Sequence, residues 1–268
     1  QQVTWEDGRG QVILDIEGDL AADPLPRQFQ GQIIVEDATI GVSALPEPLR
    51  NVTGRIRLVP TALAIVVEEL TGQFSEGQLT AQGAFPLFLP LEDVAAADSR
   101  EGEGSEGSAD ASGLNQYDPL SLNLDNIALN LKGLYDGDVD GAMVLGGSLA
   151  LGPTLSGGIE LSNGTITVPE SSGAASVQAP PDDDEGPFPP LTFENLRIVL
   201  VRNLNIVQGN FLNVNARGGL RLDGTLNTLR PAGTIRLPAG RIGLFSVALR
   251  LAGENDRAEF RGDFDPIL

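Results

Sequence analysis

The stretch GTIRLPAGRIGLF, residues 233 to 245, contains one short phrase twice. Each copy reads glycine, any residue, aliphatic, any residue, aliphatic, and the copies begin at Gly233 and Gly240. With Ile, Leu or Val at the aliphatic places, the phrase occurs nine times in 268 residues, whereas chance would give about two. Glycine permits the positive φ of a tight turn, and the residues after it begin a strand with one apolar face. The repetition therefore predicts many short strands joined by tight turns.

Hydrophobic alternation with a period of two extends this prediction along the chain. Leu120, Leu122 and Leu124 alternate with polar residues, and the pattern then slips by one residue at Ile127. Such a slip is typical of a β-bulge or of a turn. Helical spacing over ten or more residues is missing, and 33 glycines and 18 prolines oppose helices. We therefore predict an all-β fold, an elongated curled sheet of many short strands with an apolar interior.

Two acidic stretches interrupt the alternation, at residues 92–113 and 170–190. Together they contain twelve acidic residues and one arginine, a net charge of −11 out of −20 for the whole chain. Segments so poor in apolar residues cannot build a core, so we expect two flexible loops. The rest is expected to form one elongated β-repeat segment over residues 1–268, cut from a longer protein.

Composition argues against most enzyme classes. The chain contains no histidine and no cysteine, which excludes Ser-His-Asp and Cys-His catalysis and the ordinary zinc sites. Paired carboxylates for glycoside hydrolysis are less favoured because one Trp and two Tyr provide few aromatic platforms. The net charge of −20 has the wrong sign for binding nucleic acid. We expect no enzyme, no metal, no cofactor and no nucleic-acid partner.

Two glycine motifs suggest hairpin turns. DGDVDG, residues 136–141, begins like a calcium loop, but the twelfth place is Gly147 instead of a bidentate glutamate. A turn between flanking strands explains these residues without a metal. Asn163-Gly164, which also matches a glycosylation sequon, is a strong hairpin signal.

The apolar face of the expected strands is the candidate functional site. Its aliphatic side chains offer no hydrogen bonds, which suits acyl chains. The face could pack against a second sheet as a sealed sandwich, or it could fold lengthwise into an open trough. The candidate lining residues are Leu149, Leu151, Ile159, Leu161, Ile166, Val168, Leu220, Leu222, Ile235, Leu237, Ile242, Leu244, Leu249 and Leu251.

Residues 218–260, GGLRLDGTLNTLRPAGTIRLPAGRIGLFSVALRLAGENDRAEF, resemble the repeating core of the TamB family. The resemblance is clear from 147 to 268 and extends less closely over 1–91. The matching places are Gly219–Thr225, Pro231, Gly233–Leu237 and Gly240–Leu244, with an earlier turn of the pattern at 147–170.

The resemblance implies a β-taco, a long curled sheet with an apolar interior and no catalytic residues. It implies a segment that crosses the periplasm, anchored in the inner membrane by a part of the protein outside it. Its apolar groove would conduct phospholipid acyl chains between the inner and outer membranes and support outer-membrane biogenesis.

The alternative implied by the same resemblance is a chaperone or scaffold for outer-membrane protein insertion or protein translocation. It would act with an outer-membrane barrel of the Omp85 family. A lipid conduit requires a continuous apolar interior, whereas a strand acceptor requires an exposed sheet edge.

Overall fold

The structure is a computed structural model that describes residues 3–17, 28–42, 45–59, 64–87, 118–168, 189–225, 228–244, 247–251, 253 and 256–263. The acidic stretch at 92–113 lies outside the described residues. The stretch at 170–190 also lies outside them, apart from Pro189 and Pro190. No helix long and apolar enough to cross a membrane occurs in the described ranges.

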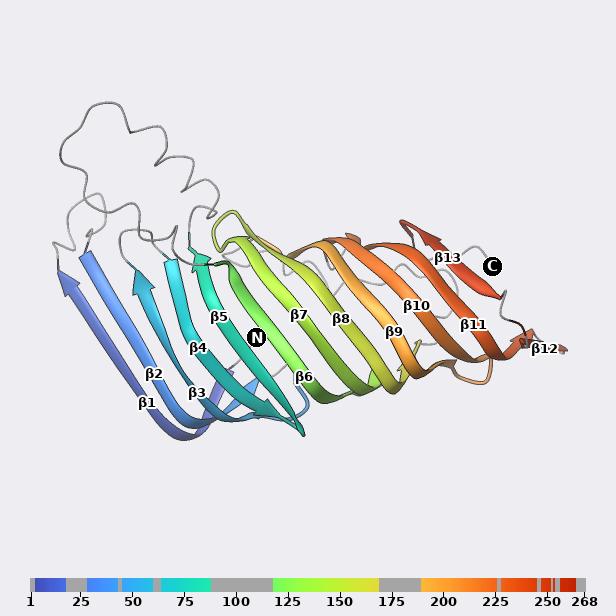
Figure 1. Ribbon diagram of the computed structural model, residues 1–268, viewed down its shortest axis with the longest axis horizontal. Helices are drawn as coiled ribbons and strands as arrows, with labels where there is room; N and C mark the ends of the chain where they lie inside the picture. Colours follow the sequence, from blue (N-terminus) through green and yellow to red (C-terminus); the bar gives the residue numbers. More distant parts are fainter. Residues whose placement is uncertain are drawn as a thin grey trace, which may run out of the picture.

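Thirteen strands of the described residues form a single sheet. Figure 1 shows them side by side in chain order from β1 to β12, with β13 beside β11. The first and last strands do not pair with each other, so the sheet is open. The prediction of an all-β, elongated and curled sheet is confirmed. The strands are β1 (Val3–Glu17), β2 (Gln28–Val42), β3 (Leu49–Val59), β4 (Ala64–Phe74), β5 (Gly77–Pro86), β6 (Leu120–Leu131), β7 (Tyr135–Ser148), β8 (Gly152–Thr167), β9 (Thr192–Gln208), β10 (Leu212–Thr225), β11 (Arg230–Leu244), β12 (Val247–Leu251) and β13 (Arg257–Arg261).

Most strands are longer than the phrase predicts. Strands β1 to β11 contain 10 to 17 residues, and only β12 and β13 are five residues long. The nine phrase glycines lie inside strands instead of in the turns between them. Most phrases therefore cover part of a longer strand, and β8 and β11 each contain the glycines of two copies, whereas the phrase that begins at Gly147 runs from the end of β7 into the following turn.

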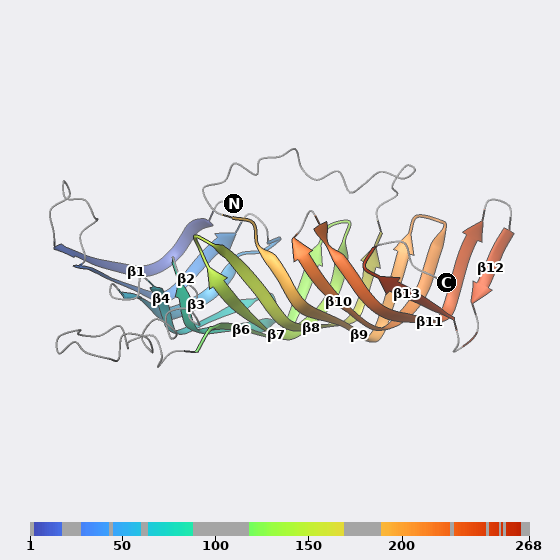
Figure 2. The same cartoon turned by 90° about the horizontal axis from the view of Figure 1, so that it is seen from above.

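The long strands bend near their middles, and Figure 2 shows the sheet curled lengthwise as a result. The bend coincides with β-bulges, where the pairing register shifts. Asn126 in β6, Asn163 in β8 and Asn203 in β9 lie at these shifts with φ of 51°, 49° and 50°. The slip in alternation before Ile127 is thus a bulge within one strand.

Side-chain hydrogen bonds connect the bulges of neighbouring strands. The Asn163 side-chain amide donates to Asp138 Oδ2 at 2.9 Å, and the Asn203 amide donates to Asn163 Oδ1 at 3.1 Å. In the next pair of strands, the backbone N–H of Asn126 donates to Asp140 Oδ1 at 2.7 Å. Polar groups freed by the irregular pairing are therefore satisfied from the adjacent strand, which keeps the bends aligned.

Both predictions of a hairpin turn were wrong. Asn163 and Gly164 lie within β8, and residues 136–141 lie within β7. The turn that precedes β7 is formed by residues 132–134. The physical reason is common to both motifs. Asn-Gly and Asp-Gly allow positive φ, and a bulge inside a strand uses that conformation as well as a turn does.

Gly218 and Gly233 show why glycine is needed inside a strand. They lie on adjacent strands, β10 and β11, with φ of 136° and 145°. A Cβ at Gly218 would collide with the carbonyl oxygen of Thr234, and one at Gly233 would collide with the carbonyl oxygen of Gly219. The tight curl of the sheet thus depends on backbone contacts that no side chain allows.

Gly218→Ala should therefore destabilise the protein, by about 2 kcal/mol or more, through both backbone strain and the collision. The matched control is Gly219→Ala, because φ at Gly219 is not positive and the nearest atom to an added Cβ is the Ile198 carbonyl oxygen at 3.4 Å. Urea unfolding should show a large loss for the first variant and little change for the second. Equal losses would contradict this explanation of the glycine phrase.

One pair of neighbouring strands differs from all the others. Strands β8 and β9 pair in parallel, whereas every other pair in the sheet is antiparallel. Thr154 of β8 lies opposite Thr192 of β9, and Thr167 lies opposite Val207. The chain leaves β8 at one margin of the curled sheet and enters β9 at the other margin.

This topology predicts that the two acidic stretches respond differently to deletion. Removing 92–113 leaves eleven residues between the adjacent, antiparallel strands β5 and β6, so the melting temperature should change little. Removing 170–190 leaves three residues to connect opposite ends of β8 and β9, where a parallel pair needs about a dozen or more. Circular dichroism melts of the two variants test this; cooperative folding of the second at the wild-type temperature would contradict the parallel pairing.

Candidate functional site

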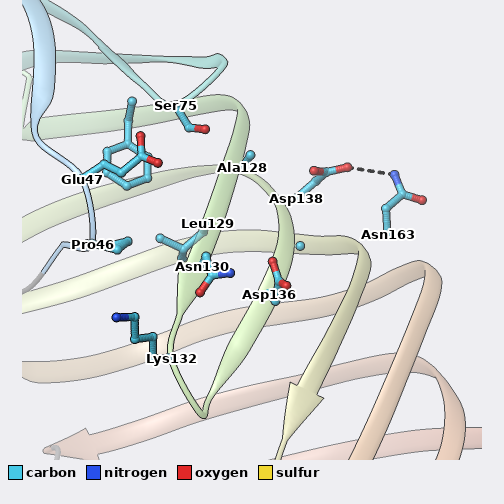
Figure 3. Close-up of a pocket in the computed structure, with 12 residues that line it drawn as sticks. Pro46, Glu47, Ser75, Ala128, Leu129, Asn130, Lys132, Asp136, Asp138 and Asn163 are labelled. Atoms are coloured by element: carbon cyan, nitrogen blue, oxygen red, sulfur yellow. Dashed lines mark hydrogen bonds between the residues drawn. The ribbon is translucent and has the colours of Figure 1, made fainter.

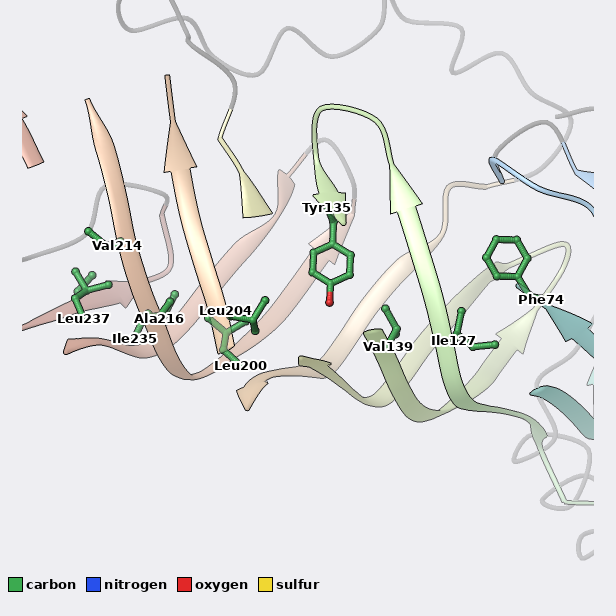
Figure 4. Close-up of a cluster of buried hydrophobic side chains, with 11 residues drawn as sticks. Phe74, Ile127, Tyr135, Val139, Leu200, Leu204, Val214, Ala216, Ile235 and Leu237 are labelled. Atoms are coloured by element: carbon green, nitrogen blue, oxygen red, sulfur yellow. The ribbon is translucent and has the colours of Figure 1, made fainter. Parts of the chain in front are cut away.

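The interior of the curled sheet has a buried apolar floor at the level of the bend (Figure 4). Its side chains come from seven strands, and each is at most 7% exposed. Most are aliphatic, so the floor presents few hydrogen-bonding groups. The floor residues are Phe74, Ile127, Tyr135, Val139, Leu200, Leu204, Val214, Ala216, Ile235, Leu237 and Ala258.

Strand register makes the floor continuous. Leu161 of β8 lies opposite Val139 of β7 on one side and Leu200 of β9 on the other. The same row continues from Leu200 through Gly218 and Ile235 to Ala258 of β13. Because directly opposed residues share a face of the sheet, this row places apolar atoms along six consecutive strands.

Above the floor, the two sides of the curled sheet, its walls, carry apolar residues that are mostly half buried. On one wall, Ile166, Ile206 and Leu251 belong to one row across β8, β9 and β12, which passes through the buried floor residue Val214 of β10. On the other wall, a row runs through Ile159, Ile198, Leu220 and Phe260. The described residues form a single sheet, so no second sheet closes a sandwich over this face; the bottom of the curl is buried, and the walls retain accessible apolar surface. The half-buried apolar residues packed on the floor cluster are Leu45, Leu49, Leu124, Leu129, Leu161, Ile166, Ile198, Ile206, Leu212, Leu220, Ile242, Leu251 and Phe260.

The fourteen residues expected to line the groove separate into four groups. Seven lie in the floor or pack against it: Leu161, Ile166, Leu220, Ile235, Leu237, Ile242 and Leu251. Ile159 and Leu222 lie half buried on the same face, opposite Ile198 and Leu196. The structure does not bring Leu149, Leu151, Val168 and Leu249 into this cluster, and it leaves the Leu244 side chain outside its description.

Three of these four residues lie where strands end. Leu149 and Leu151 belong to the turn after β7, and Leu151 is 64% exposed. Val168 follows the last residue of β8, and alternation places a residue on a face only while the strand continues. Leu249 is different: it is 49% exposed, but it lies opposite Ile242 in the short strand β12 and therefore shares the face of the floor.

Sequence reasoning missed the whole contribution of β9. Leu196, Leu200 and Leu204 are each at most 5% exposed, and Ile198 and Ile206 pack on the floor. This strand contains no glycine before Gln208, so the phrase search passes over it. The remaining signal is alternation at 196–200 and again at 204–206, interrupted by the bulge at Asn203.

Tyr135 is the one floor residue with a side-chain hydroxyl. This hydroxyl donates to the Asp138 carbonyl oxygen at 2.8 Å and lies 3.3 Å from the Ser162 carbonyl oxygen. Both carbonyls lie beside the bulge that separates the pairs formed by Asp136 and Asp138. Burial raises the pKa of Tyr135 to about 12, so the residue stays neutral near physiological pH.

A cavity of about 520 Å³ with several polar side chains opens beside the bend, next to Phe74 of the floor (Figure 3). Asp136, Asp138, Asn163, Glu47 and Lys132 line it together with apolar residues. The hydrogen bond between Asp138 and Asn163 lies in its wall. No group of three or more acidic, His or Cys side chains in the described residues is arranged to hold a metal ion.

Tyr135→Phe should lower the free energy of unfolding by about 1–3 kcal/mol, because a carbonyl beside the bulge loses its donor. The raised pKa adds a pH dependence. Because the folded state holds the proton more tightly, the stabilisation is present below pH 10.0 and is lost as the pH rises towards about 12. Urea unfolding across this range should show a steeper loss for the wild type than for the variant. Parallel curves would contradict a buried, hydrogen-bonded hydroxyl.

A comparison with models of protein families gave a match. The family model described as TamB C-terminal domain matches residues 68–255, which is more than half of the chain and includes most strands of the floor but not β13, which carries Ala258. No match was found among curated proteins or among solved structures. The family consists of transport and assembly modules, and membership implies a role in outer-membrane assembly and a place in the cell envelope. The chain belongs to the TamB family.

Proposed function

We propose that the groove conducts phospholipid acyl chains across the periplasm, between the inner and outer membranes. The observation that carries the proposal is the continuous apolar interior from β6 to β13, with a sealed floor and half-buried walls. With strands about 4.8 Å apart, the floor from β6 to β11 extends about 24 Å along the sheet. The protein would be anchored in the inner membrane by a part outside this segment, and would meet an Omp85-family barrel at the outer membrane.

The chemistry of the walls suits transport better than tight binding. Burying one methylene group is worth about 0.8 kcal/mol, so an acyl chain gains affinity from any position along the groove. Aliphatic walls such as Ile206, Leu220 and Ile242 provide no directional contacts. One position is therefore much like the next, and a chain can slide without breaking hydrogen bonds.

A second candidate function is supported by the opposite end of the sheet. Strand β1 pairs only with β2, so one edge carries no partner among the described residues. On its inner face Val3, Val12 and Leu14 are 70%, 70% and 58% exposed, and Trp5 is 46% exposed. An exposed edge with alternating apolar residues can pair with an incoming strand. This edge supports the alternative role, as a scaffold for outer-membrane proteins or translocating proteins.

The conduit is tested by adding a charge to a wall and detecting lipid beyond it. Leu220→Asp is suitable because Leu220 is half buried, whereas a carboxylate at Leu237 in the floor should unfold the protein. A photoreactive benzoylphenylalanine replaces Phe260, which lies in the same row two strands away. Wild-type protein should retain lipid detectable by extraction and mass spectrometry, and should crosslink to it. Leu220→Asp should reduce both signals.

The matched control is Thr234→Asp, because Thr234 is exposed on the outer face directly opposite Gly219. This variant carries the same added charge and should retain lipid and crosslinking. Folded wild-type protein without lipid, or unchanged crosslinking in Leu220→Asp, would argue against the conduit. Val12→Pro should block strand pairing at the β1 edge. If this variant no longer binds an incoming strand but still retains lipid, the result would favour the scaffold.

A further inference from the structure

Arginine side chains gather on the outer face of strands β9 to β13. Ten arginines lie between Arg197 and Arg261, against four acidic residues in the same stretch, a net charge of +6 in a chain of total charge −20. All ten are exposed. Alternation separates them from the groove by a single residue: Arg236 points outward between Ile235 and Leu237, which are buried in the floor.

Strand register places arginine opposite arginine on this face. Arg217 of β10 lies opposite Arg236 of β11, and Arg236 lies opposite Arg257 of β13. We call these three residues the central arginine row. Two further pairs flank it, Arg197 with Arg221 and Arg241 with Arg250. Like charges directly opposite each other destabilise a sheet, and a bound anion between them would remove the repulsion.

The chain's own carboxylates neutralise only part of this face. Arg221 pairs with Asp223 at 3.0 Å, and Arg261 pairs with Glu259 at 2.9 Å. Within the described residues, no salt bridge involves the central arginine row, and only Arg257 has a carboxylate in electrostatic reach, that of Glu259, which already pairs with Arg261. A cavity of about 680 Å³, lined in part by Arg241 and Arg250, opens beside one flanking pair. The positive charge is therefore available to an external anion.

We propose that this arginine face docks on the surface of an anionic phospholipid bilayer. Three features favour lipid phosphates over an acidic protein. The guanidinium group binds phosphate oxygens through two parallel hydrogen bonds, and every cation of the face is an arginine. The face extends over several strands, so it meets an array of anions, which a bilayer provides.

The third feature is the lack of aromatic or large aliphatic side chains at the centre of the outer face, on β10 and β11; on β9 the outward apolar residues opposite Gly219 and Asn213 are the smaller Val199 and Val207. Protein interfaces depend on buried aromatic or large aliphatic side chains near their centre. The described outward positions between the arginines of β10 and β11 hold small or polar residues: Asn213, Asn215, Gly219, Asp223, Ala232, Thr234, Ala239 and Gly243. Such a surface suits electrostatic contact with headgroups.

Charge on the neighbouring strands would orient the contact. Asp125, Asp136, Asp138, Asp140 and Glu160 lie on β6 to β8. These carboxylates are repelled by an anionic bilayer while β9 to β13 are attracted. Salt at physiological concentration screens charges beyond about 8 Å, so the distant acidic residues do not cancel the local attraction. The inference concerns the outer face and does not depend on lipid entering the groove.

The test measures cosedimentation of the whole chain with vesicles of phosphatidylcholine, with and without phosphatidylglycerol. The protein should bind only the anionic vesicles, and added salt should release it, unlike acyl chains held in an apolar groove. Arg217→Gln combined with Arg236→Gln should weaken this binding about tenfold or more. The matched control is Arg9→Gln with Arg50→Gln, which removes the same charge from exposed positions on β1 and β3 and should bind normally.

Three results would overturn the proposal: no binding to anionic vesicles, equal loss in the control, or binding to polyaspartate without binding to vesicles. The last would indicate an acidic protein partner. Failure of this proposal and failure of the conduit are distinguishable. Leu220→Asp should keep its vesicle binding while losing groove lipid, and the arginine variant should keep groove lipid while losing vesicle binding. Circular dichroism of each variant confirms that the sheet is retained.

Discussion

The structure depends on bending long strands at one common level. A strand's side chains alternate strictly between faces, so each bend has to keep the apolar residues on the same side before and after it. In β11 this needs one additional residue. Ile235 and Leu237 face the interior at odd-numbered positions, whereas Ile242 faces it at an even-numbered position. The register shift between them inserts the additional residue that keeps all three side chains on the interior face. Bulges in β6 and β8 do the same, whereas the inward residues of β9 keep even numbers from Leu200 to Leu204 across its bulge. Hydrogen bonds from Asn163 and Asn203 connect the bulges of neighbouring strands. Without this alignment, the two walls could not share one buried floor.

Local sequence patterns were sufficient for the fold class but not for the position of the bend. Alternation and repeated glycine predict a curled sheet because both act within a few residues. They cannot distinguish a bulge from a turn, as Asn163-Gly164 shows, since both use positive φ; the difference is whether the following residues pair with the same neighbour. Floor and wall residues look alike in the sequence for the same reason. Leu200 is buried and Ile198 is half buried only because of their distance from the bend. The glycine phrase found much of β8, β10 and β11, and missed β9, which bends at Asn203.

The two faces of the sheet have independent chemistry. A strand that reads Ile235, Arg236, Leu237 contributes to an uncharged interior and a cationic exterior within three residues. Nothing in the packing of the floor constrains the outward residues beyond their ability to form strands. Interior hydrophobicity can therefore remain uniform along the sheet while outer charge changes from acidic on β6–β8 to basic on β9–β13. The uniform apolar interior suits a ligand that moves along the sheet. The local positive charge on the outer face suits a binding partner that stays at one place.

The single parallel pair has a consequence for how the chain reaches this structure. Nearly every other pairing joins strands that are consecutive in the sequence and antiparallel, so folding can spread from strand to strand as in a repeat protein. The pair β8–β9 requires a connection that crosses from one margin of the sheet to the other before any of its hydrogen bonds form, and the antiparallel pair β5–β6 has to close an even longer connection, so both pairings should be slow. The sheet thus consists of two antiparallel parts, β1–β8 and β9–β13, with a topological boundary between them. The same boundary separates the acidic strands β6–β8 from the arginine-rich strands β9–β13. The outer face therefore changes from negative to positive charge where the two parts of the sheet meet.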